Sequence, residues 1–390
     1  MNLKIKYSKS TIENVILPFF MGWIVFSPFS STLTIKIFHL PLSAPELLFI
    51  PFIPYFIRKF IKILNIRLLL ILLLTWCAYF SISLIVNDYS IFEIIGCART
   101  YLYIILFFTI FTSNQSPIFE TMSYISYGAL LGWVLDICIG LLSFSSSGEL
   151  SIGYGPMIAL PIAICYPALN NKLKLSTLIF IICIIIGILG GLRRVIFISL
   201  ILYLAVYTYI GTQNKRKRIK TIYIISIVSI IMVLSYPIIK EAIHDYSWDL
   251  YVRIILKSEG MFNGEGNSGD DSRSQFINDY FVNIDNYIVP QGFVSKQYST
   301  TGNGMYNDFP LAEISHSFGL MIVIISIIYF GIKSYYIYNR ISKGKLDKKY
   351  LIYPFGYITI CLLLFMEGSF ITFPYQAIYS GYLISGICKY

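Results

Sequence analysis

The stretch RLLLILLLTWCAYFSISLIV, residues 67–86, decides the fold class of this chain. Its only charged residue is Arg67 at the start, and the rest is apolar or weakly polar. A helix that crosses a bilayer core about 30 Å thick needs ~20 such residues. Because lipid offers no hydrogen-bond partners, the backbone of this stretch must pair within itself as a helix. We therefore expect residues 67–86 to form a transmembrane helix.

Similar apolar runs recur along the 390 residues and predict an all-α, polytopic integral membrane protein. Hydrophobic residues make up 56% of the chain and charged residues only 13%, whereas a soluble domain carries roughly 25% charged residues. From the number of runs we expect about twelve transmembrane helices. The expected spans are 12–34, 42–57, 67–86, 91–112, 118–143, 153–169, 175–192, 195–211, 221–239, 313–332, 350–369 and 372–388.

One long polar stretch, residues 240–312, separates the ninth expected span from the tenth. We expect it to be a large loop inserted into a single membrane domain that covers residues 1–390. It contains Asp270 and Asp271 after a glycine-rich run, and its part 273–289 alternates polar and apolar residues. That alternation favours a short helix lying at the membrane surface.

The net charge of +10 fits a membrane protein that has no nucleic-acid partner, because cytoplasmic loops of membrane proteins are rich in Lys and Arg. With both termini in the cytoplasm, most of the 30 Lys and Arg residues fall on the cytoplasmic side, and the loop 240–312 falls on the other side. The seven cysteines lie in or beside apolar runs and form no CxxC pair. We interpret them as small buried apolar residues.

Two arginines stand on the side where this orientation disfavours positive charge. Arg193 and Arg194 follow Gly190 and Gly191 in the short connection between the seventh and eighth expected spans. A guanidinium group binds phosphate oxygens through two parallel hydrogen bonds. The pair therefore predicts a phosphate or pyrophosphate site near the membrane surface. The alternative is that both side chains only reach lipid headgroups.

Arg99 lies within the fourth expected span, eight residues after Ile91. An arginine near the centre of a transmembrane helix costs on the order of 2.5–3.5 kcal/mol on insertion scales. We therefore expect Arg99 to face a polar cavity. An internal ion pair with Glu93 or Asp136 is the alternative.

The polar loop and the start of the tenth span supply three more candidates, Arg273, Asp308 and His316. Asp308 or His316 could act as a general base, and either could equally be a solvated loop residue or a helix cap. The sequence has no Walker, GxGxxG or HExxH motif in a suitable context. We therefore expect no direct use of ATP or of a nucleotide sugar.

Taken in order, several of these residues resemble the O-antigen polymerase and ligase superfamily over about 190–332. The resemblance rests on a glycine–arginine turn that leads into an apolar helix, and on short motifs in and after the polar loop. These are Gly190-Gly191-Leu192-Arg193-Arg194-Val195-Ile196-Phe197, Ser272-Arg273, Pro290-Gln291-Gly292-Phe293, Asn307-Asp308 and Gly319. Ligases of this type usually carry His-Asn where this chain has Asn307-Asp308, so the resemblance favours a polymerase.

The resemblance implies a GT-C-like glycosyltransferase of the bacterial inner membrane whose large loop is periplasmic. Its substrates would be undecaprenyl-pyrophosphate-linked oligosaccharides, with undecaprenyl pyrophosphate as the leaving group. Arg193, Arg194, Arg273 and Arg99 would bind the pyrophosphate, with Arg273 also placed among the catalytic residues. Asp308 or His316 would orient or deprotonate the attacking hydroxyl. No cofactor or metal is expected, and the partners would be membrane lipid and a chain-length regulator protein.

Three other functions stay open from the sequence. One is a membrane acyltransferase, although no His lies with a nearby acidic residue in a convincing membrane-embedded motif. A lipid-linked oligosaccharide flippase or other transporter would also have many spans, although we find no inverted repeat. An O-antigen ligase would differ from a polymerase only in its acceptor.

Overall fold

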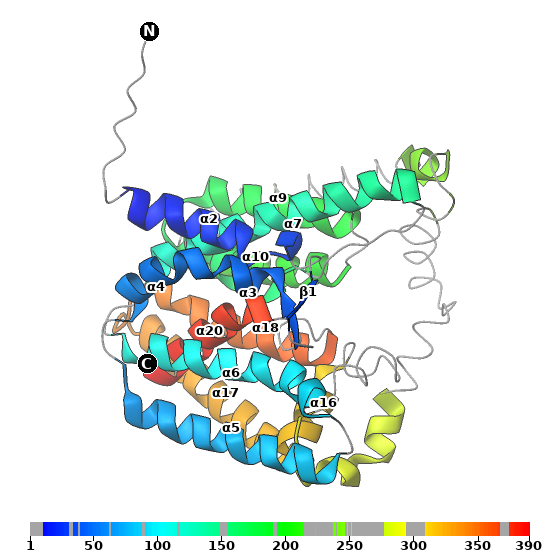
Figure 1. Ribbon diagram of the computed structural model, residues 1–390. Coiled ribbons are helices and arrows are strands. Elements are labelled where there is room, and N and C mark those ends of the chain that lie inside the picture. The colour runs from blue at the N-terminus through cyan, green and yellow to red at the C-terminus, as the bar shows by residue number, and fades with distance from the viewer. Residues whose placement is uncertain are drawn as a thin grey trace.

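The computed structural model describes residues 11–30, 34–37, 40–61, 64–87, 90–114, 118–147, 155–189, 193–213, 240–245, 277–293, 309–366 and 374–390, with residues 223, 237, 238, 248 and 251. The described chain is predominantly helical, and the long helices run side by side (Figure 1). Among the residues that the structure describes, five helices are long and apolar enough to cross a membrane, as expected for a helical membrane protein. They are α5 (Ile66–Val86), α6 (Ile91–Ser113), α7 (Phe119–Ser147, apolar over Phe119–Leu142), α17 (Leu320–Ser342) and the segment Lys348–Met366.

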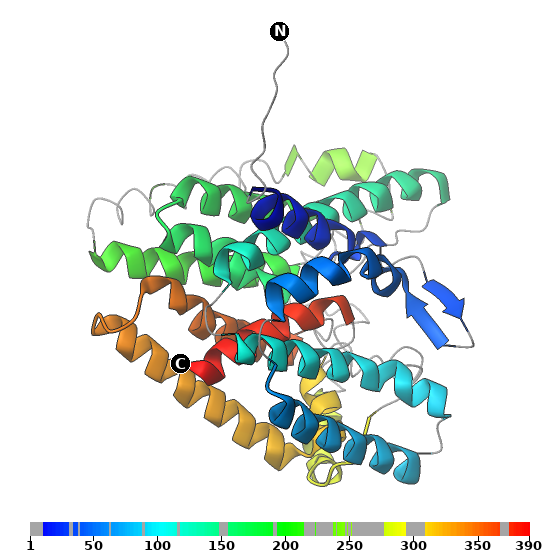
Figure 2. The ribbon, with the colours of Figure 1, turned by 60° about the vertical axis from the view of Figure 1, so that its left-hand side comes forward.

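Shorter elements connect and flank these helices. Figure 2 shows the one strand pair of the described residues, an antiparallel hairpin, at an edge of the molecule. In chain order the elements are η1 (Ile12–Ile16), α2 (Leu17–Ile24), η2 (Pro28–Ser30), β1 (Thr34–Ile37), β2 (Leu40–Ser43), α3 (Ala44–Leu48), η3 (Ile50–Phe52), α4 (Ile53–Phe60), η4 (Met157–Ala159), η5 (Pro161–Cys165), α8 (Tyr166–Leu169), α9 (Leu173–Leu189), α10 (Arg193–Gln213), η7 (Ile284–Tyr287), α16 (Pro310–Phe318), η9 (Lys348–Leu351), α18 (Ile352–Met366), η10 (Pro374–Gln376) and α20 (Ala377–Lys389).

Local capping sets the ends of the best-predicted helices. Asn65 caps α5 by accepting a hydrogen bond from the backbone N–H of Leu68 at 3.1 Å. Ser90 and Glu93 form a reciprocal capping box at the start of α6. Both motifs satisfy backbone N–H groups that the first helical turn leaves unpaired. The starts of α5 and α6 accordingly lie within one residue of those expected for 67–86 and 91–112.

Three expected spans are corrected by the structure. The helix expected over 12–34 ends at Ile24, and the chain continues into the hairpin. The span over 42–57 is divided into α3, η3 and α4, because its prolines remove backbone donors. The span over 313–332 is broken at Gly319, which has φ +84°, so that α16 ends there and α17 runs on to Ser342. The span expected over 221–239 lies almost wholly outside the described residues.

The cysteine interpretation holds only in part. Cys165 and Cys183 are buried as expected, but Cys77 and Cys138 are exposed. Because Cys77 lies on α5 and Cys138 on α7, both within apolar helices, an exposed thiol there adjoins apolar surface.

The helices form two groups of neighbours. In the first group α2 packs on α7, α7 contacts α9, and α9 contacts α10. In the second, α6 contacts α5 and α20, while α18 contacts both α17 and α20. The pair α2 and α7 approaches very closely, since a Cβ added at Gly22 would lie 2.0 Å from the Ile125 carbonyl oxygen. Small residues permit this kind of backbone approach between apolar helices.

Helix ends rich in Lys and Arg lie together, and we call this the basic end of the molecule. Asn114 after α6 donates to the Phe60 carbonyl oxygen at the end of α4 at 2.5 Å. The Lys349 ammonium lies 5.9 Å from the centre of the Phe119 ring at the start of α7. The basic residues of these ends are Arg58, Lys59, Arg67, Lys172, Lys174, Arg340, Lys343, Lys345, Lys348, Lys349 and Lys389. Lys and Arg gather at one end of a membrane protein when the connections that carry them lie on one side of the membrane.

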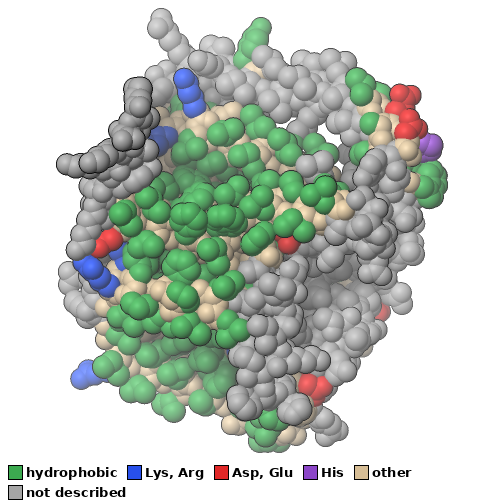
Figure 3. All heavy atoms as spheres, turned by 45° about the horizontal axis from the view of Figure 1, so that its top comes forward, with side chains coloured by type: hydrophobic (Ala, Val, Ile, Leu, Met, Phe, Trp, Pro, Cys, Tyr) green, Lys and Arg blue, Asp and Glu red, His purple; other side chains and the backbone are tan. Residues whose placement is uncertain are grey.

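Apolar side chains cover much of the molecule between its two ends. Figure 3 shows a broad apolar area on one face, with Lys and Arg side chains toward one edge. On α5, Ser83 is the one buried residue, so this helix presents nearly all its side chains outward. An exposed apolar surface of this extent is suited to contact with lipid.

Candidate functional site

Two glutamates lie on opposite faces of α6, and both are largely buried. The first is Glu46 on α3, whose Oε2 lies 3.4 Å from Nη1 of Arg99. The side chains of Arg99 and Glu46 are 11% and 13% exposed. Tyr103 donates a hydrogen bond of 2.7 Å to the other carboxylate oxygen of Glu46. Arg99 and Tyr103 are four residues apart and therefore share one face of the helix.

The sequence alternative of an internal ion pair for Arg99 is thus realised, but with a different partner. Glu93 closes the capping box of α6. Asp136 is buried on α7, whereas the ion pair of Arg99 is with Glu46. Because α3 is held beside α6, a residue from the proline-rich segment supplies the carboxylate.

An apolar groove of about 400 Å³ has Glu46 of this ion pair in its lining, whereas Arg99 does not line it. Glu46 and Tyr103 line its polar end, and Ile61 and Ile110 line it near the basic end. The other lining residues are all aliphatic or aromatic and come from α3, α4, α6, η10, Phe49 and the two residues that follow α2. The groove is therefore lined by hydrocarbon up to the carboxylate that is paired with Arg99.

Glu313, the second glutamate, lies on α16 and has no cationic partner among the described residues. Tyr101 donates a hydrogen bond of 3.1 Å to Oε1 of Glu313. Oε2 has no hydrogen-bond partner within the part of the chain that the structure describes, and the residue is 8% exposed. Burial raises the pKa of Glu313 to about 7, against a smaller lowering by the hydrogen bond from Tyr101. Glu313 was not among the residues expected to be functional.

The segment 290–293, which carries the Pro-Gln-Gly-Phe motif, packs between α5 and α16. Asn87, at the end of α5, donates to the Gln291 carbonyl oxygen at 3.0 Å. The backbone N–H of Phe293 donates to Oγ of Ser83 at 2.6 Å. The ring of Phe293 is fully buried and stacks on Tyr101 with centroids 5.3 Å apart. The motif thus supports the tyrosine that binds Glu313.

His316 holds the same segment from the other side. Its backbone carbonyl accepts a hydrogen bond from the N–H of Gln291 at 2.8 Å. Nδ1 of His316 lies 3.3 Å from the Gly292 carbonyl oxygen, and the proton must be on Nδ1 because a carbonyl oxygen only accepts. Burial lowers the pKa of His316, partly opposed by this bond. His316 therefore positions the motif as a neutral imidazole.

The remaining predicted site residues are not gathered at one place among the described residues. Arg273 and Asp308 lie outside the described residues. Arg193 and Arg194 begin α10, at the end of the molecule opposite the basic end. α10 contacts α18, and α18 in turn contacts α16. The joint role of these residues in binding pyrophosphate stays a prediction.

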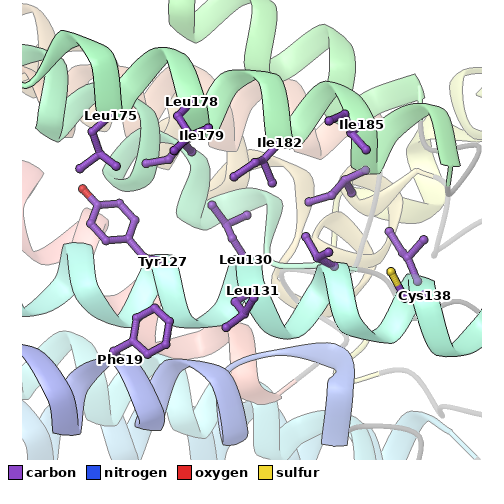
Figure 4. A pocket seen from close by; sticks show the side chains of 13 residues that line it. Phe19, Tyr127, Leu130, Leu131, Cys138, Leu175, Leu178, Ile179, Ile182 and Ile185 are labelled. Atoms are coloured by element: carbon purple, nitrogen blue, oxygen red, sulfur yellow. The ribbon is translucent and has the colours of Figure 1, made fainter.

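A second apolar groove of about 520 Å³ lies between α7 and α9, with Phe19 of α2 at its side (Figure 4). None of its 13 lining residues is charged. Tyr127 on α7 faces Leu175 on α9 at one end, and Cys138 lies toward Ile185 at the other (Figure 4). The uncharged lining of this groove suits hydrocarbon chains.

Comparisons of the chain with family models and curated proteins, and of its fold with solved structures, found no match.

Proposed function

We propose that this chain is a membrane glycosyltransferase of the O-antigen polymerase type. It would join undecaprenyl-pyrophosphate-linked repeat units at the periplasmic face of the bacterial inner membrane. The observation that carries the proposal is the apolar groove whose lining includes Glu46, the ion-pair partner of Arg99. A substrate with a polyprenyl tail and a diphosphate needs a hydrocarbon-lined groove with a cation close to its end, and Arg99 would be that cation, beside Glu46.

The reaction requires fixed positive charge where the leaving group forms. A hydroxyl of one repeat unit attacks the anomeric carbon of another, the bond from that carbon to the phosphate oxygen breaks, and undecaprenyl pyrophosphate leaves. Arginines placed in advance stabilise the charge that develops on this group. Arg99 would act at the head of the groove, and Arg193, Arg194 and Arg273 would complete the set. The diphosphate is already activated, so neither ATP nor a metal is needed.

Three residues are candidates for receiving the hydroxyl proton. Asp308 and His316 are the two expected from the sequence. Glu313 joins them because its Oε2 is unpartnered among the described residues and its pKa is raised to about 7, which suits a general base at neutral pH. The hydrogen bond from His316 to Gly292 favours a positioning role for the histidine.

The proposal also includes the architecture and the protein partner that the family resemblance implies. The architecture comprises twelve spans of GT-C-like type, with α17 as the tenth, and both termini in the cytoplasm. A chain-length regulator would be the protein partner.

The proposal is tested by deleting the gene and separating surface lipopolysaccharide on a gel. We expect the polymer ladder to be replaced by core carrying a single repeat unit, because flipping and ligation still work. Bare core would instead indicate a flippase or a ligase, and an unchanged ladder would refute all three functions.

Complementation then assigns the site. Wild type should restore the ladder, whereas the double variant Arg99→Met with Glu46→Gln should not, since it lacks the cation but leaves no unpaired buried charge. Lys345→Ala, at an exposed position of the basic end, is the matched control and should restore the ladder. Membrane levels of all three proteins are measured in parallel.

A further inference from the structure

The groove between α7 and α9 starts at the basic end and has the depth of one lipid leaflet. Its lining runs from Leu175 to Ile186 on α9 and from Tyr127 to Cys138 on α7. Tyr127 faces Leu175 at the end of the groove where α9 begins (Figure 4). Eleven residue steps along a helix rise about 17 Å, close to half of a hydrocarbon core about 30 Å thick. The tail of a lipid from the leaflet at the basic end therefore matches the groove in length.

The groove is open toward the surrounding bilayer. Leu131, Leu178 and Ile185 of its lining are 38%, 53% and 49% exposed, and Cys138 is exposed as well. None of the lining residues carries a charge. An acyl chain can thus enter the groove sideways from the hydrocarbon core without passing a polar barrier.

Two lysines flank the groove at the basic end. Lys174 lies four residues before Leu178, which lines the groove, so the two share one side of α9. Lys172 lies three residues before Leu175, another lining residue. Both lysines are exposed, and neither has an ion-pair partner in the described ranges of the chain. Because a lysine lays its stem along apolar surface and keeps its ammonium group in water, both can reach the mouth of the groove.

The turn before α9 fixes the backbone from which these side chains extend. The N–H of Lys172 donates to the Pro167 carbonyl oxygen at 2.7 Å, and the Lys172 carbonyl oxygen accepts from the N–H groups of Leu175 and Ser176 at 3.1 and 3.2 Å. Oγ of Ser176 donates to the Ile164 carbonyl oxygen at 2.7 Å. The positive charge at the mouth of the groove is therefore held in place by the fold.

A phosphate without a cation of its own is the head that fits this mouth. Lys174 directly precedes the lining residue Leu175. Glu120 is an exposed acid at the start of α7, but it lies seven residues before Tyr127, which is about 10 Å further along the helix. A phosphate attached to a tail in the groove would thus lie closer to the lysines than to this carboxylate. A glycerol head keeps the negative charge of the phosphate, whereas an ethanolamine head brings a cation beside the lysines.

We propose that the α7–α9 groove binds an anionic phospholipid of the leaflet at the basic end, with an acyl chain in the groove and its phosphate beside Lys172 and Lys174. The bound lipid fills the space between α7 and α9 and contributes to their packing. This lipid site does not depend on the proposed glycosyltransferase function, because it uses none of the residues assigned to the reaction.

Cys138 can report whether the groove is occupied, because it lines the end farther from the lysines. Cys77, on α5, is also an exposed thiol on an apolar helix and serves as the internal control. The purified full chain, in micelles of an uncharged detergent, is titrated with phosphatidylglycerol. Alkylation of each thiol by N-ethylmaleimide is followed by peptide mass spectrometry. Phosphatidylglycerol should slow the alkylation of Cys138 severalfold and leave that of Cys77 unchanged.

The role of the head is tested with phosphatidylethanolamine that carries the same acyl chains. A lysine near an anionic headgroup strengthens binding about fivefold, so two lysines predict half-maximal protection of Cys138 by phosphatidylglycerol at about 25-fold lower concentration. Lys172→Gln with Lys174→Gln should remove this preference. Lys343→Gln with Lys345→Gln removes the same charge from the connection after α17, which does not line the groove, and should retain it.

The role of the apolar lining is tested by filling the groove. Leu131→Trp with Leu178→Trp adds bulk to the half of the groove nearer the lysines, and should abolish the protection of Cys138 by lipid. Leu204→Trp with Ile328→Trp adds the same bulk at exposed positions of α10 and α17 outside the groove, and should leave the protection intact. Thermal unfolding of each variant without lipid verifies that it is folded.

The lipid site is overturned if phosphatidylglycerol leaves the alkylation of Cys138 unchanged in the wild type, or if phosphatidylethanolamine protects it at equal concentration. A variant with Lys172→Gln and Lys174→Gln that still prefers phosphatidylglycerol would overturn it as well. This variant alters only exposed side chains, so the test does not depend on whether the tryptophan variant folds.

Discussion

Glu46 and Glu313 pack against opposite faces of α6, where their partners Tyr103 and Tyr101 are two residues apart. The two carboxylates are stabilised in different ways. Glu46 faces Arg99 and accepts a hydrogen bond from Tyr103. Glu313 accepts one hydrogen bond, from Tyr101, and its second oxygen has no partner among the described residues. The first carboxylate is balanced by a cation. The second is enclosed by packing, which favours its protonated form.

The difference shows that two buried acids packed against one helix respond to different perturbations. The stability of the surroundings of Glu46 depends on the opposite charge of Arg99. Removing one partner of a buried ion pair leaves the other charge uncompensated. The Glu313 side depends on how the segment 290–293 packs against α5 and α16, and on pH. Each of the three following experiments disturbs one side and leaves the other intact.

The largest effect is expected from Arg99→Met. It strands the carboxylate of Glu46 in a buried site, which should lower the free energy of unfolding by about 3–5 kcal/mol. Adding Glu46→Gln removes the stranded charge and should recover most of the loss. Unfolding of the purified protein in micelles, followed by tryptophan fluorescence, measures both. Equal stability of the single variant and the wild type would show that the pair is not buried in the folded protein.

Gly292→Ala should disturb the packing around Glu313. It should lower the free energy of unfolding by somewhat less than Arg99→Met does. Gly292 has φ +85°, and an added Cβ would lie 2.3 Å from Oγ of Ser83. Backbone strain of ~1–2 kcal/mol and overpacking of ~1–3 kcal/mol both apply. The matched control is Gly344→Ala, because Gly344 has φ +68° but nothing within 4 Å of the added atom.

The comparison of the two alanine variants isolates the packing contribution. Gly344→Ala should lose only the backbone part, and Gly292→Ala should lose distinctly more in the same unfolding measurement. Identical losses would mean that the segment 290–293 does not press against α5.

The smallest effect is expected from Glu313→Gln, and it depends on pH. The folded state raises the pKa of Glu313 from 4.5 to about 7, so the folded state binds this proton more tightly than the unfolded state. The associated stability is fully present below pH 4.5 and is lost as pH rises through 7. The glutamine variant lacks this loss, and at pH 8 it should exceed wild type by about 1–3 kcal/mol.

Unfolding curves of both proteins at pH 4.5 and pH 8 measure this difference. The two proteins should be equally stable at the lower pH. A constant difference between them at both pH values would contradict a raised pKa, and would point to a hydrogen-bonding effect of the substitution.

The long helices could be predicted from the sequence because composition alone determines them. α5, α6 and α7 each come from one continuous apolar run, and Asn65 and Ser90 are side chains that favour a helix start. The break at Gly319 was missed because the apolar pattern continues across it, and hydropathy does not report the sign of φ. α17 likewise runs past the expected end at residue 332, because the helix tolerates Lys333 and Arg340 near the basic end.

The candidate site was predicted less well than the fold. Arg99 could be singled out because a bilayer disfavours its charge, but its partner depends on how α3 folds back against α6. Glu313 lies in an apolar run that looked like the start of a span, and only the tertiary structure shows that it meets Tyr101. A signal was present, since a lone acid in such a run is as costly as Arg99. The resemblance instead assigns the chemistry to its neighbours Asp308 and His316.

The outward position of α5 has a consequence for how chains of this fold diverge. Its side chains other than Ser83 are partly or fully exposed on the apolar face of the molecule, where any residue of similar hydropathy serves equally well. Mutations there should accumulate freely, whereas Ser83 must accommodate Gly292 and receive the N–H of Phe293. Common ancestry among such proteins would therefore persist in a few inward-facing positions long after the identity of the surrounding helix has been lost.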